Sequence, residues 1–146
     1  MRLFLDANVL FSAAQNEEGR AAALFDLAGR GYCALIASPH AVEEARRNLE
    51  LKHPKLLRRL ERLLRAVAVC QECLPENAEW ARAEMLPAKD APILGAAAQA
   101  GAGHLVTGDR KHFGHLHGKT LRGVYIATPA EALARVLDRA RRRQSC

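Results

Sequence analysis

The segment RLFLDANVLF, residues 2–11, is a short apolar run that breaks at Asp6. A second segment of the same form, HLVTGD at residues 104–109, ends at Asp109. Continuous apolar runs of this length, bounded by turn residues, are typical of strands that are buried on both faces of a parallel sheet. These two segments therefore predict two buried strands, each followed closely by a carboxylate.

Further apolar runs alternate with helical patterns along the whole chain. Runs at residues 33–37, 66–70 and 123–127 are additional strand candidates. Helices are predicted at residues 18–30, 38–51, 54–64, 76–85, 89–100 and from 128 into the arginine-rich end. Two of them open on Ser38-Pro39 and Thr128-Pro129, a capping residue followed by a proline at the first helical position. This alternation predicts an α/β fold with a central parallel sheet of four to five strands.

Length and composition favour one domain over residues 1–146, because 146 residues that are 49% hydrophobic can bury one sizeable core. No apolar stretch reaches the ~20 residues of a membrane span and no signal peptide is evident, so we expect a cytoplasmic protein. The four cysteines do not suggest a disulfide framework in a domain of this size. Cys70 and Cys73 have CxxC spacing, but a zinc site needs a second pair of ligands, so two incidental thiols are the favoured interpretation.

Four acidic residues lie at predicted strand ends or near the starts of predicted helices: Asp6, Glu44, Asp90 and Asp109. Open parallel sheets bind ligands beyond the carboxyl ends of their strands, where the strand order reverses, so we expect these side chains to share one crevice. Carboxylates that meet raise each other's pKa unless a cation lies between them. Mg²⁺ or Mn²⁺ takes oxygen ligands, and a bound ion of this kind can activate water for attack on a phosphodiester.

Each acid also has an ordinary structural interpretation. Asp6 and Asp109 would serve turns, Asp90 would cap the helix that begins beside it, and Glu44 would face solvent. Glu43 stands next to Glu44, and the sequence alone does not separate the two. Their joint placement in one predicted topology favours a shared site over four separate explanations.

Positive charge is concentrated in a basic segment from Arg46 to Arg65 and in the arginine-rich end from Arg135, and the net charge of the chain is +6. Such surfaces attract polyanions, although a stripe of leucines on the same helix also permits a simple solvated surface. We expect RNA contacts from Arg46, Arg47, Arg58, Arg59, Arg62 and Arg110. The polar side chains expected to support the carboxylates or the phosphate are Asn8, Ser38 and Thr107.

The chain resembles the PIN-domain family, and in particular its VapC-like toxin ribonucleases. The matching pieces are LFLDANVLFSA, SPHAVEE, DAPILGAAAQAGAGHLVTGDRKHF and TPAEAL, which follow in the expected order and span nearly the whole chain. The resemblance implies a three-layer α/β/α domain and a Mg²⁺- or Mn²⁺-dependent ribonuclease that hydrolyses RNA phosphodiester bonds through a metal-activated water. It also implies that Asp6, Glu44, Asp90 and Asp109 are both the catalytic residues and the metal ligands.

The resemblance further implies the partners: an RNA substrate, an antitoxin protein and a second copy of the chain in a homodimer. Two alternatives stay open, a stand-alone RNA-processing nuclease and a non-catalytic RNA-binding module. A phosphatase with an aspartyl nucleophile is disfavoured, because such sites need a second Asp where this chain has Asn8. The histidines at 112, 115 and 117 are less typical of the family, and a loop with surface histidines is favoured over a transition-metal site.

Overall fold

The computed structural model describes residues 1–145, which contain a six-stranded sheet of order β3-β2-β1-β4-β6-β5. Its strands are β1 Arg2–Leu5, β2 Ala34–Ala37, β3 Val67–Val69, β4 His104–Val106, β5 Thr120–Leu121 and β6 Val124–Ala127. The predicted strands are all present, and the α/β fold class is confirmed. The inner strands are apolar and buried, as the unbroken apolar runs require, with Leu3, Phe4 and Leu105 fully inaccessible.

The sheet has six strands, whereas four to five were predicted. The extra strand is β5, which pairs antiparallel with β6, whereas all other neighbours are parallel. Arg122 and Gly123 join the two strands with positive φ angles of 48° and 82°, as a tight hairpin turn requires. A strand of two residues carries no periodic signal, so the sequence pattern could not predict it.

Eight α-helices and one short 3₁₀ helix accompany the sheet in the described part of the chain. They are α1 Ala7–Gln15, α2 Arg20–Gly29, α3 Pro39–Lys52, η1 Pro54–Leu56, α4 Leu57–Leu64, α5 Pro75–Arg82, α6 Ala91–Gln99, α7 Arg110–Phe113 and α8 Pro129–Gln144. The predicted caps are confirmed, since Ser38 accepts from the amide of Ala41 and Thr128 from the amide of Glu131. Helices α1 and α7 were not predicted.

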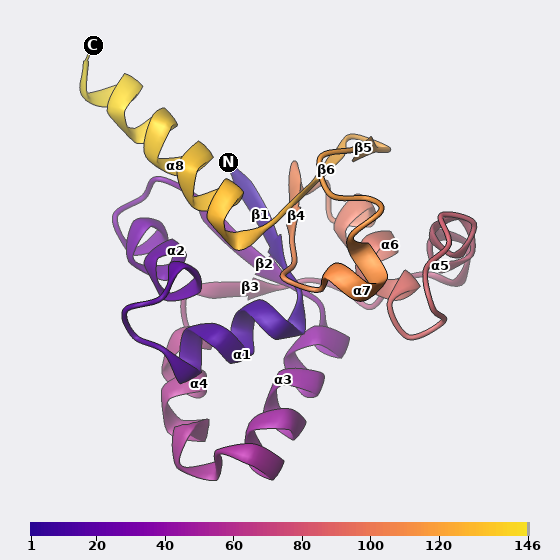
Figure 1. Cartoon of the computed structure of the whole chain (residues 1–146), viewed down its shortest axis with the longest axis horizontal. Coiled ribbons are helices and arrows are strands. Elements are labelled where there is room, and N and C mark those ends of the chain that lie inside the picture. Colours follow the sequence, from indigo (N-terminus) through magenta and orange to yellow (C-terminus); the bar gives the residue numbers. More distant parts are fainter. Residues whose placement is uncertain (146) are drawn as a thin grey trace.

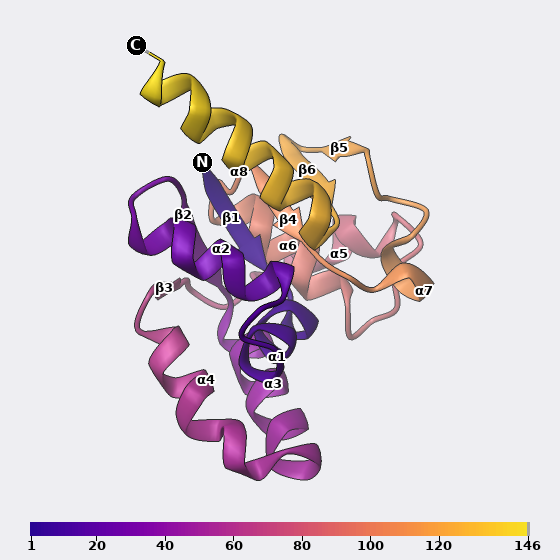
Figure 2. The same cartoon turned by 60° about the vertical axis from the view of Figure 1, so that its left-hand side comes forward.

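The helices form layers on both sides of the sheet. Figures 1 and 2 place α5 and α6 on one side and α1, α2 and α8 on the other, which confirms the three-layer arrangement. Helices α3 and α4 extend past the carboxyl end of β1, at the bottom of Figure 1. No helix of residues 1–145 is both long and apolar enough to cross a membrane.

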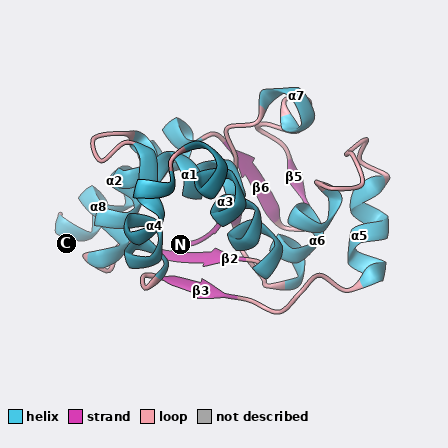
Figure 3. Cartoon of the chain, turned by 90° about the horizontal axis from the view of Figure 1, so that it is seen from below, coloured by secondary structure: helices cyan, strands magenta, loops and turns pink. Residues whose placement is uncertain are grey.

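The strand order reverses at β1, which lies between β2 and β4. The chain moves outward from β1 to β2 and β3, and it then returns to the other side of β1 for β4, β6 and β5. The register pairs Leu5 with Val106, so the residues that follow the two strands are neighbours. Figure 3, seen from below, shows α1 and α3 in front of the sheet, with α6 and α7 further to the right in the view. A ligand crevice is expected at this reversal.

Candidate functional site

A cavity of about 430 Å³ lies at the carboxyl ends of β1 and β4. Its walls include all four predicted acids, Asp6, Glu44, Asp90 and Asp109. Asp6 follows β1 directly, Glu44 lies in α3, and Asp90 and Asp109 immediately precede α6 and α7. Four segments far apart in the sequence thus bring one carboxylate each to the same space.

Asp6 is buried and held by hydrogen bonds on both carboxylate oxygens. Its Oδ1 accepts from the amide of Ala7 at 2.7 Å, and its Oδ2 accepts from Oγ1 of Thr107 at 2.8 Å. Nδ2 of Asn8 donates to the same Oδ2 at 3.0 Å. Burial raises the pKa of Asp6 to about 6 against the lowering effect of the Thr107 and Ala7 hydrogen bonds, and the charges of Glu44 and Asp90 raise it further.

Asn8 and Thr107 connect the ends of β1 and β4. Nδ2 of Asn8 donates to Oγ1 of Thr107 at 3.1 Å, and Oδ1 of Asn8 accepts from the amide of Gly108 at 2.8 Å. Oγ1 of Thr107 also accepts from the amide of Asp109 at 3.2 Å. These bonds fix the distance between two of the acidic segments, which is the supporting position predicted for both polar residues.

Asp109 is bonded to His112 through both oxygens. Oδ1 accepts from the His112 amide at 3.0 Å, as the cap of α7, and Nδ1 of the His112 ring lies 3.0 Å from Oδ2. Burial acts to raise the pKa of Asp109, but the amide, the charge and the ring hydrogen bond of His112 together with the amide of Lys111 hold it below its ordinary value. The predicted turn role of Asp109 is therefore present, and it leaves the carboxylate inside the cavity.

Asp90 has no comparable set of partners. It occupies the position before α6, but its side chain makes no capping hydrogen bond, so the alternative interpretation of Asp90 as a helix cap is wrong. Nδ1 of His112 lies 3.0 Å from Oδ2 of Asp90 as well as from Oδ2 of Asp109. The hydrogen-bond geometry favours Asp109, and Oδ2 of Asp90 is left buried without a hydrogen-bond partner among residues 1–145. Burial raises the pKa of Asp90, while the charges of His112 and Lys89 lower it.

Asp90, Asp109 and His112 form the one group of metal-type side chains in the described part of the chain, with one ligand atom from each within 4.8 Å of the others. Asp6 and Glu44 line the same cavity outside this group. The expectation that residues 112–117 form a loop of surface histidines is wrong for His112, which belongs to α7 and contacts two of the acids. The sequence feature that could have indicated this contact is that His112 follows Asp109 by three residues.

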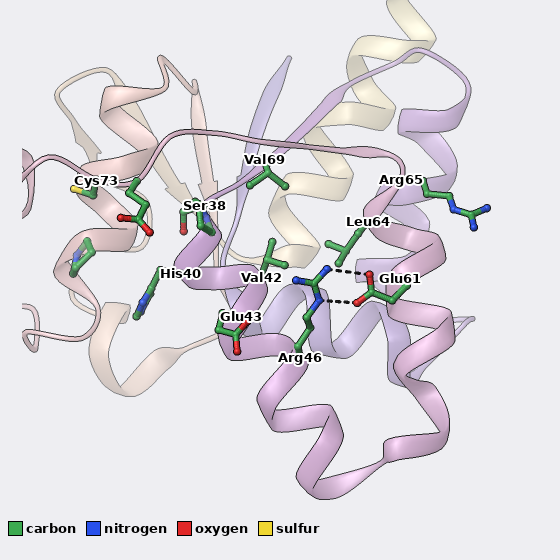
Figure 4. A pocket seen from close by; sticks show the side chains of 13 residues that line it. Ser38, His40, Val42, Glu43, Arg46, Glu61, Leu64, Arg65, Val69 and Cys73 are labelled. Carbon is green, nitrogen blue, oxygen red and sulfur yellow. Dashed lines mark hydrogen bonds and ion pairs between the residues drawn. The ribbon is translucent and has the colours of Figure 1, made fainter.

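The two adjacent glutamates of α3 lie in different places. Glu44 lines the cavity with the three aspartates. Glu43 lines a separate groove of about 1050 Å³ between α3, α4 and the edge strand β3, shown in Figure 4. Neighbouring residues on a helix point about 100° apart, so only one of the two can face the acids. The structure places Glu44 there.

Ser38 does not line the acid cavity. It is 2% exposed, it lies in the wall of the larger groove, and its hydroxyl accepts the Ala41 amide at the start of α3. The expectation that its hydroxyl holds a carboxylate or the phosphate is therefore wrong. Its contribution is indirect, since it caps the helix that carries Glu44.

Two of the six arginines predicted to contact RNA are engaged within the protein. Arg46 donates to Glu61 from Nε at 2.6 Å and from a terminal nitrogen at 3.0 Å, as Figure 4 shows. Arg59 donates to the carbonyl of Ala13 and pairs with Glu17. Both guanidinium groups thus have partners from distant parts of the sequence, and their contact with RNA stays a prediction. The remaining residues of the set, Arg47, Arg58, Arg62 and Arg110, are exposed.

The cavity also has basic residues that the sequence analysis did not single out. Lys52 and Lys89 line its wall. Lys52 lies at the end of α3, with its ammonium 5.7 Å from the centre of the Phe11 ring. Cations at the edge of an acidic cavity can contact an anion that approaches the carboxylates.

The other histidines of the segment make separate contacts. Nε2 of His115 lies 2.7 Å from the carbonyl of Glu84, and Nε2 of His117 lies 3.0 Å from the carbonyl of Thr107. The three histidines therefore do not converge on one ion. Cys33, Cys70 and Cys73 are free thiols, and none belongs to a metal-type cluster in the described range.

Comparison with known proteins identifies the family. The family model for the PIN domain matches residues 2–111 of this chain. No curated protein matches the sequence.

Solved structures share the fold at low sequence identity. VapBC2 from Rickettsia felis, bound to a DNA fragment from their promoter, aligns with a TM-score of 0.67 and 15% identity over 88% of this chain and 98% of that one. PAE2754 from Pyrobaculum aerophilum aligns with a TM-score of 0.67 and 19% identity over 94% and 96%. VapC20 from Mycobacterium tuberculosis, described as a sarcin-ricin loop cleaving toxin, aligns with a TM-score of 0.54 and 17% identity over 75% and 91%.

Proposed function

The chain belongs to the PIN domain family, and on this premise we propose that it is a Mg²⁺- or Mn²⁺-dependent ribonuclease that hydrolyses RNA phosphodiester bonds. The observation that carries the proposal is the buried Oδ2 of Asp90, which has no hydrogen-bond partner among residues 1–145 although three further carboxylates line the same cavity. A buried carboxylate is costly unless it is paired, and the cationic-type group beside this oxygen, Nδ1 of His112, is shared with Asp109. A divalent cation is a partner for several carboxylates at once.

Asp90 and Asp109 are the carboxylates closest to a common position, and they would hold the ion together with Asp6 and Glu44. The donor set fits a hard divalent ion, because it consists mainly of carboxylate oxygens. When bound, such an ion lowers the pKa of a coordinated water and neutralises charge on the reacting phosphate. We assign the catalytic and metal-binding role to these four acids.

The neighbouring polar residues orient the acids in this proposal. Asn8 and Thr107 hold Oδ2 of Asp6 and tie its strand to the segment of Asp109. Side chains held in this way keep one geometry without reorganising during the reaction. Lys52 and Lys89, at the wall of the cavity, would contact the phosphate groups that flank the cleavage point.

RNA is the proposed substrate, and the basic surface supports it. The exposed arginines Arg47, Arg58, Arg62 and Arg110 would neutralise phosphates along the bound strand. Binding of this kind weakens steeply with salt, because each neutralised phosphate releases counterions. The solved structure of VapC20, described as a loop-cleaving toxin, has the same fold and is consistent with this substrate class.

We further propose that the protein is the toxin of a toxin–antitoxin pair, active in the cytoplasm and able to form a homodimer. The similarity to VapBC2 in fold supports a protein partner, because that structure contains the two components together. A short reading frame directly upstream, coding for a DNA-binding segment, should be present and its product should co-purify with this chain. Its absence would leave a stand-alone RNA-processing nuclease.

The decisive experiment compares cleavage and binding in the same variants. Asp6→Asn and Asp109→Asn should each abolish cleavage of RNA in Mn²⁺ or Mg²⁺ while RNA still binds, since neither change touches the basic surface. Glu43→Gln, which alters a carboxylate outside the acid cavity, is the matched control and should cleave like the parent protein. Retained cleavage in both aspartate variants would contradict the site. An absence of cleavage in the parent protein, with salt-dependent RNA binding, would favour the non-catalytic RNA-binding module.

A further inference from the structure

The imidazole of His112 lies between two acids of the proposed metal site. Its Nδ1 is 3.0 Å from Oδ2 of Asp90 and 3.0 Å from Oδ2 of Asp109. The ring is not a chance neighbour, because the His112 amide also donates to Oδ1 of Asp109 at 3.0 Å and holds the residue against that carboxylate. The Nδ1 nitrogen is therefore equally close to one carboxylate oxygen of Asp90 and one of Asp109.

The spacing of these three atoms is that of ligands around one ion. Ligands at about 2.1 Å from an octahedral ion are about 3.0 Å apart when they are adjacent. The two distances from Nδ1 have this value, and the three atoms all lie within 4.8 Å of one another. An ion between them would also provide the missing partner for Oδ2 of Asp90.

A nitrogen in the ligand set changes which ion the site prefers. Mg²⁺ binds oxygen ligands and retains its waters, whereas first-row transition ions also bind imidazole nitrogen, with Mn²⁺ the weakest binder among them. The neutral ring can present a lone pair at Nδ1 when its proton is on Nε2, so ligation leaves the ring uncharged. A site of carboxylates alone would discriminate less between Mg²⁺ and Mn²⁺.

We propose that His112 is a direct metal ligand and that it makes this centre selective for a transition ion such as Mn²⁺ over Mg²⁺. The inference rests on the proposed function, because it concerns the same acids, and it adds an assignment of the ion and a fifth residue. His115 and His117 have no part in it, since each contacts a backbone carbonyl elsewhere.

The test is a direct search for nitrogen next to bound Mn²⁺. Pulsed electron paramagnetic resonance of the Mn²⁺-loaded full chain should show the modulation of a coordinated imidazole nitrogen. The signal should disappear in His112→Asn, which can still donate a hydrogen bond to Asp109 but offers no imidazole. The matched control, His115→Asn, should retain it.

Calorimetric titrations with MnCl₂ and MgCl₂ give a second measurement. His112→Asn should weaken Mn²⁺ binding by about tenfold or more and should leave the Mg²⁺ affinity within a factor of about three. An equal loss for both ions would overturn the proposal in favour of a positioning role, in which the ring only holds Asp90 and Asp109.

The outcomes separate this inference from the proposed function. Mn²⁺ bound to the parent protein without a nitrogen signal overturns the role of His112, and RNA cleavage in that sample leaves the ribonuclease intact. A nitrogen signal without RNA cleavage supports the metal ligand and removes the nuclease. Failure of the parent protein to bind Mn²⁺ overturns the role of His112, and failure to bind either Mn²⁺ or Mg²⁺ overturns both. The signal of the parent protein needs no variant, so misfolding of His112→Asn cannot hide the answer.

Discussion

Helix α3 borders two cavities that differ in the balance between acidic and basic side chains. The groove of about 1050 Å³ on one side is lined by three glutamates and two arginines, namely Glu43, Glu61, Glu72, Arg46 and Arg65, and Arg46 forms an ion pair with Glu61. The cavity of about 430 Å³ on the other side contains Glu44 and three aspartates. The charges of the larger space therefore nearly balance, whereas the four acids of the smaller one face only the basic Lys52 and Lys89 among its lining residues.

This difference shows that cavity size does not identify the site. The Arg46 hydrogen bonds hold the pKa of Glu61 below its ordinary value, as in an ordinary surface ion pair. In the smaller cavity, burial raises the pKa of both Asp6 and Asp90, so the fold itself disfavours the ionised acids. Carboxylates kept at such a cost support the proposed cation, for which the groove has no comparable set of acids.

The largest expected effect comes from Asp90, the acid whose buried Oδ2 has no hydrogen-bond partner among residues 1–145. Asp90→Asn should reduce both Mn²⁺ affinity and RNA cleavage by more than ~100-fold, because the amide offers no negative charge to the ion. The same variant without metal should unfold at no lower urea concentration than the parent protein, since it removes a buried charge. Calorimetry, a cleavage assay and urea unfolding measure the three quantities. A variant with full metal affinity would show that the two cavities do not differ in the proposed way.

The second prediction concerns pH in the absence of metal. The pKa of Asp6 is about 6 in the folded protein against an ordinary 3.8, so the fold favours its protonated form. Below about pH 4 Asp6 is protonated in both the folded and the unfolded state, and its contribution to the free energy of unfolding is complete. As the pH rises to about 6, the unfolded state ionises first, and the free energy of unfolding falls by about 3 kcal/mol. Asp90 has its pKa raised as well and acts in the same direction.

Urea unfolding in EDTA between pH 4 and 7 measures this loss. Asp6→Asn should flatten the decline, because the amide does not titrate, and Glu43→Gln should leave it unchanged. Millimolar Mn²⁺ should restore stability near pH 7 by binding the folded state. A stability that rises steadily from pH 4 to 7 in EDTA would contradict the environment assigned to Asp6.

The third prediction separates the adjacent glutamates. Glu44→Gln should weaken Mn²⁺ binding by about tenfold, because Glu44 contributes charge to the acid cavity without belonging to its closest group of ligands. Glu43→Gln should bind Mn²⁺ like the parent protein. Isothermal titration of the two variants in one buffer measures the contrast, and equal affinities would remove Glu44 from the site.

The smallest effect is expected in the groove. Arg46→Met breaks the pair with Glu61, whose side chains are 44% and 49% exposed. Exposed pairs stabilise proteins by at most about 1 kcal/mol, so the urea midpoint should move little and metal affinity should not change. A large loss of metal binding would show that the two cavities are coupled through α3.

Much of the fold and part of the site could be predicted from local patterns. Unbroken apolar runs identified the five strands that carry the parallel sheet, and capping residues before prolines located the starts of α3 and α8. Asp6 and Asp109 follow such runs closely, so their place at one end of the sheet was predictable. The helix α7 and the strand β5 were missed because four and two residues are too few to show a period.

The sequence by itself determined the alternating α/β fold and the end of the sheet at which its acids gather, because strand and helix periods are properties of neighbouring residues. Only the tertiary structure decided that Glu44 rather than Glu43 faces these acids and that His112 joins Asp90 and Asp109. It also decided that Arg46 and Arg59 are paired within the protein. These choices depend on which segments the strand order brings side by side, and contacts between residues distant in sequence leave no local pattern to read.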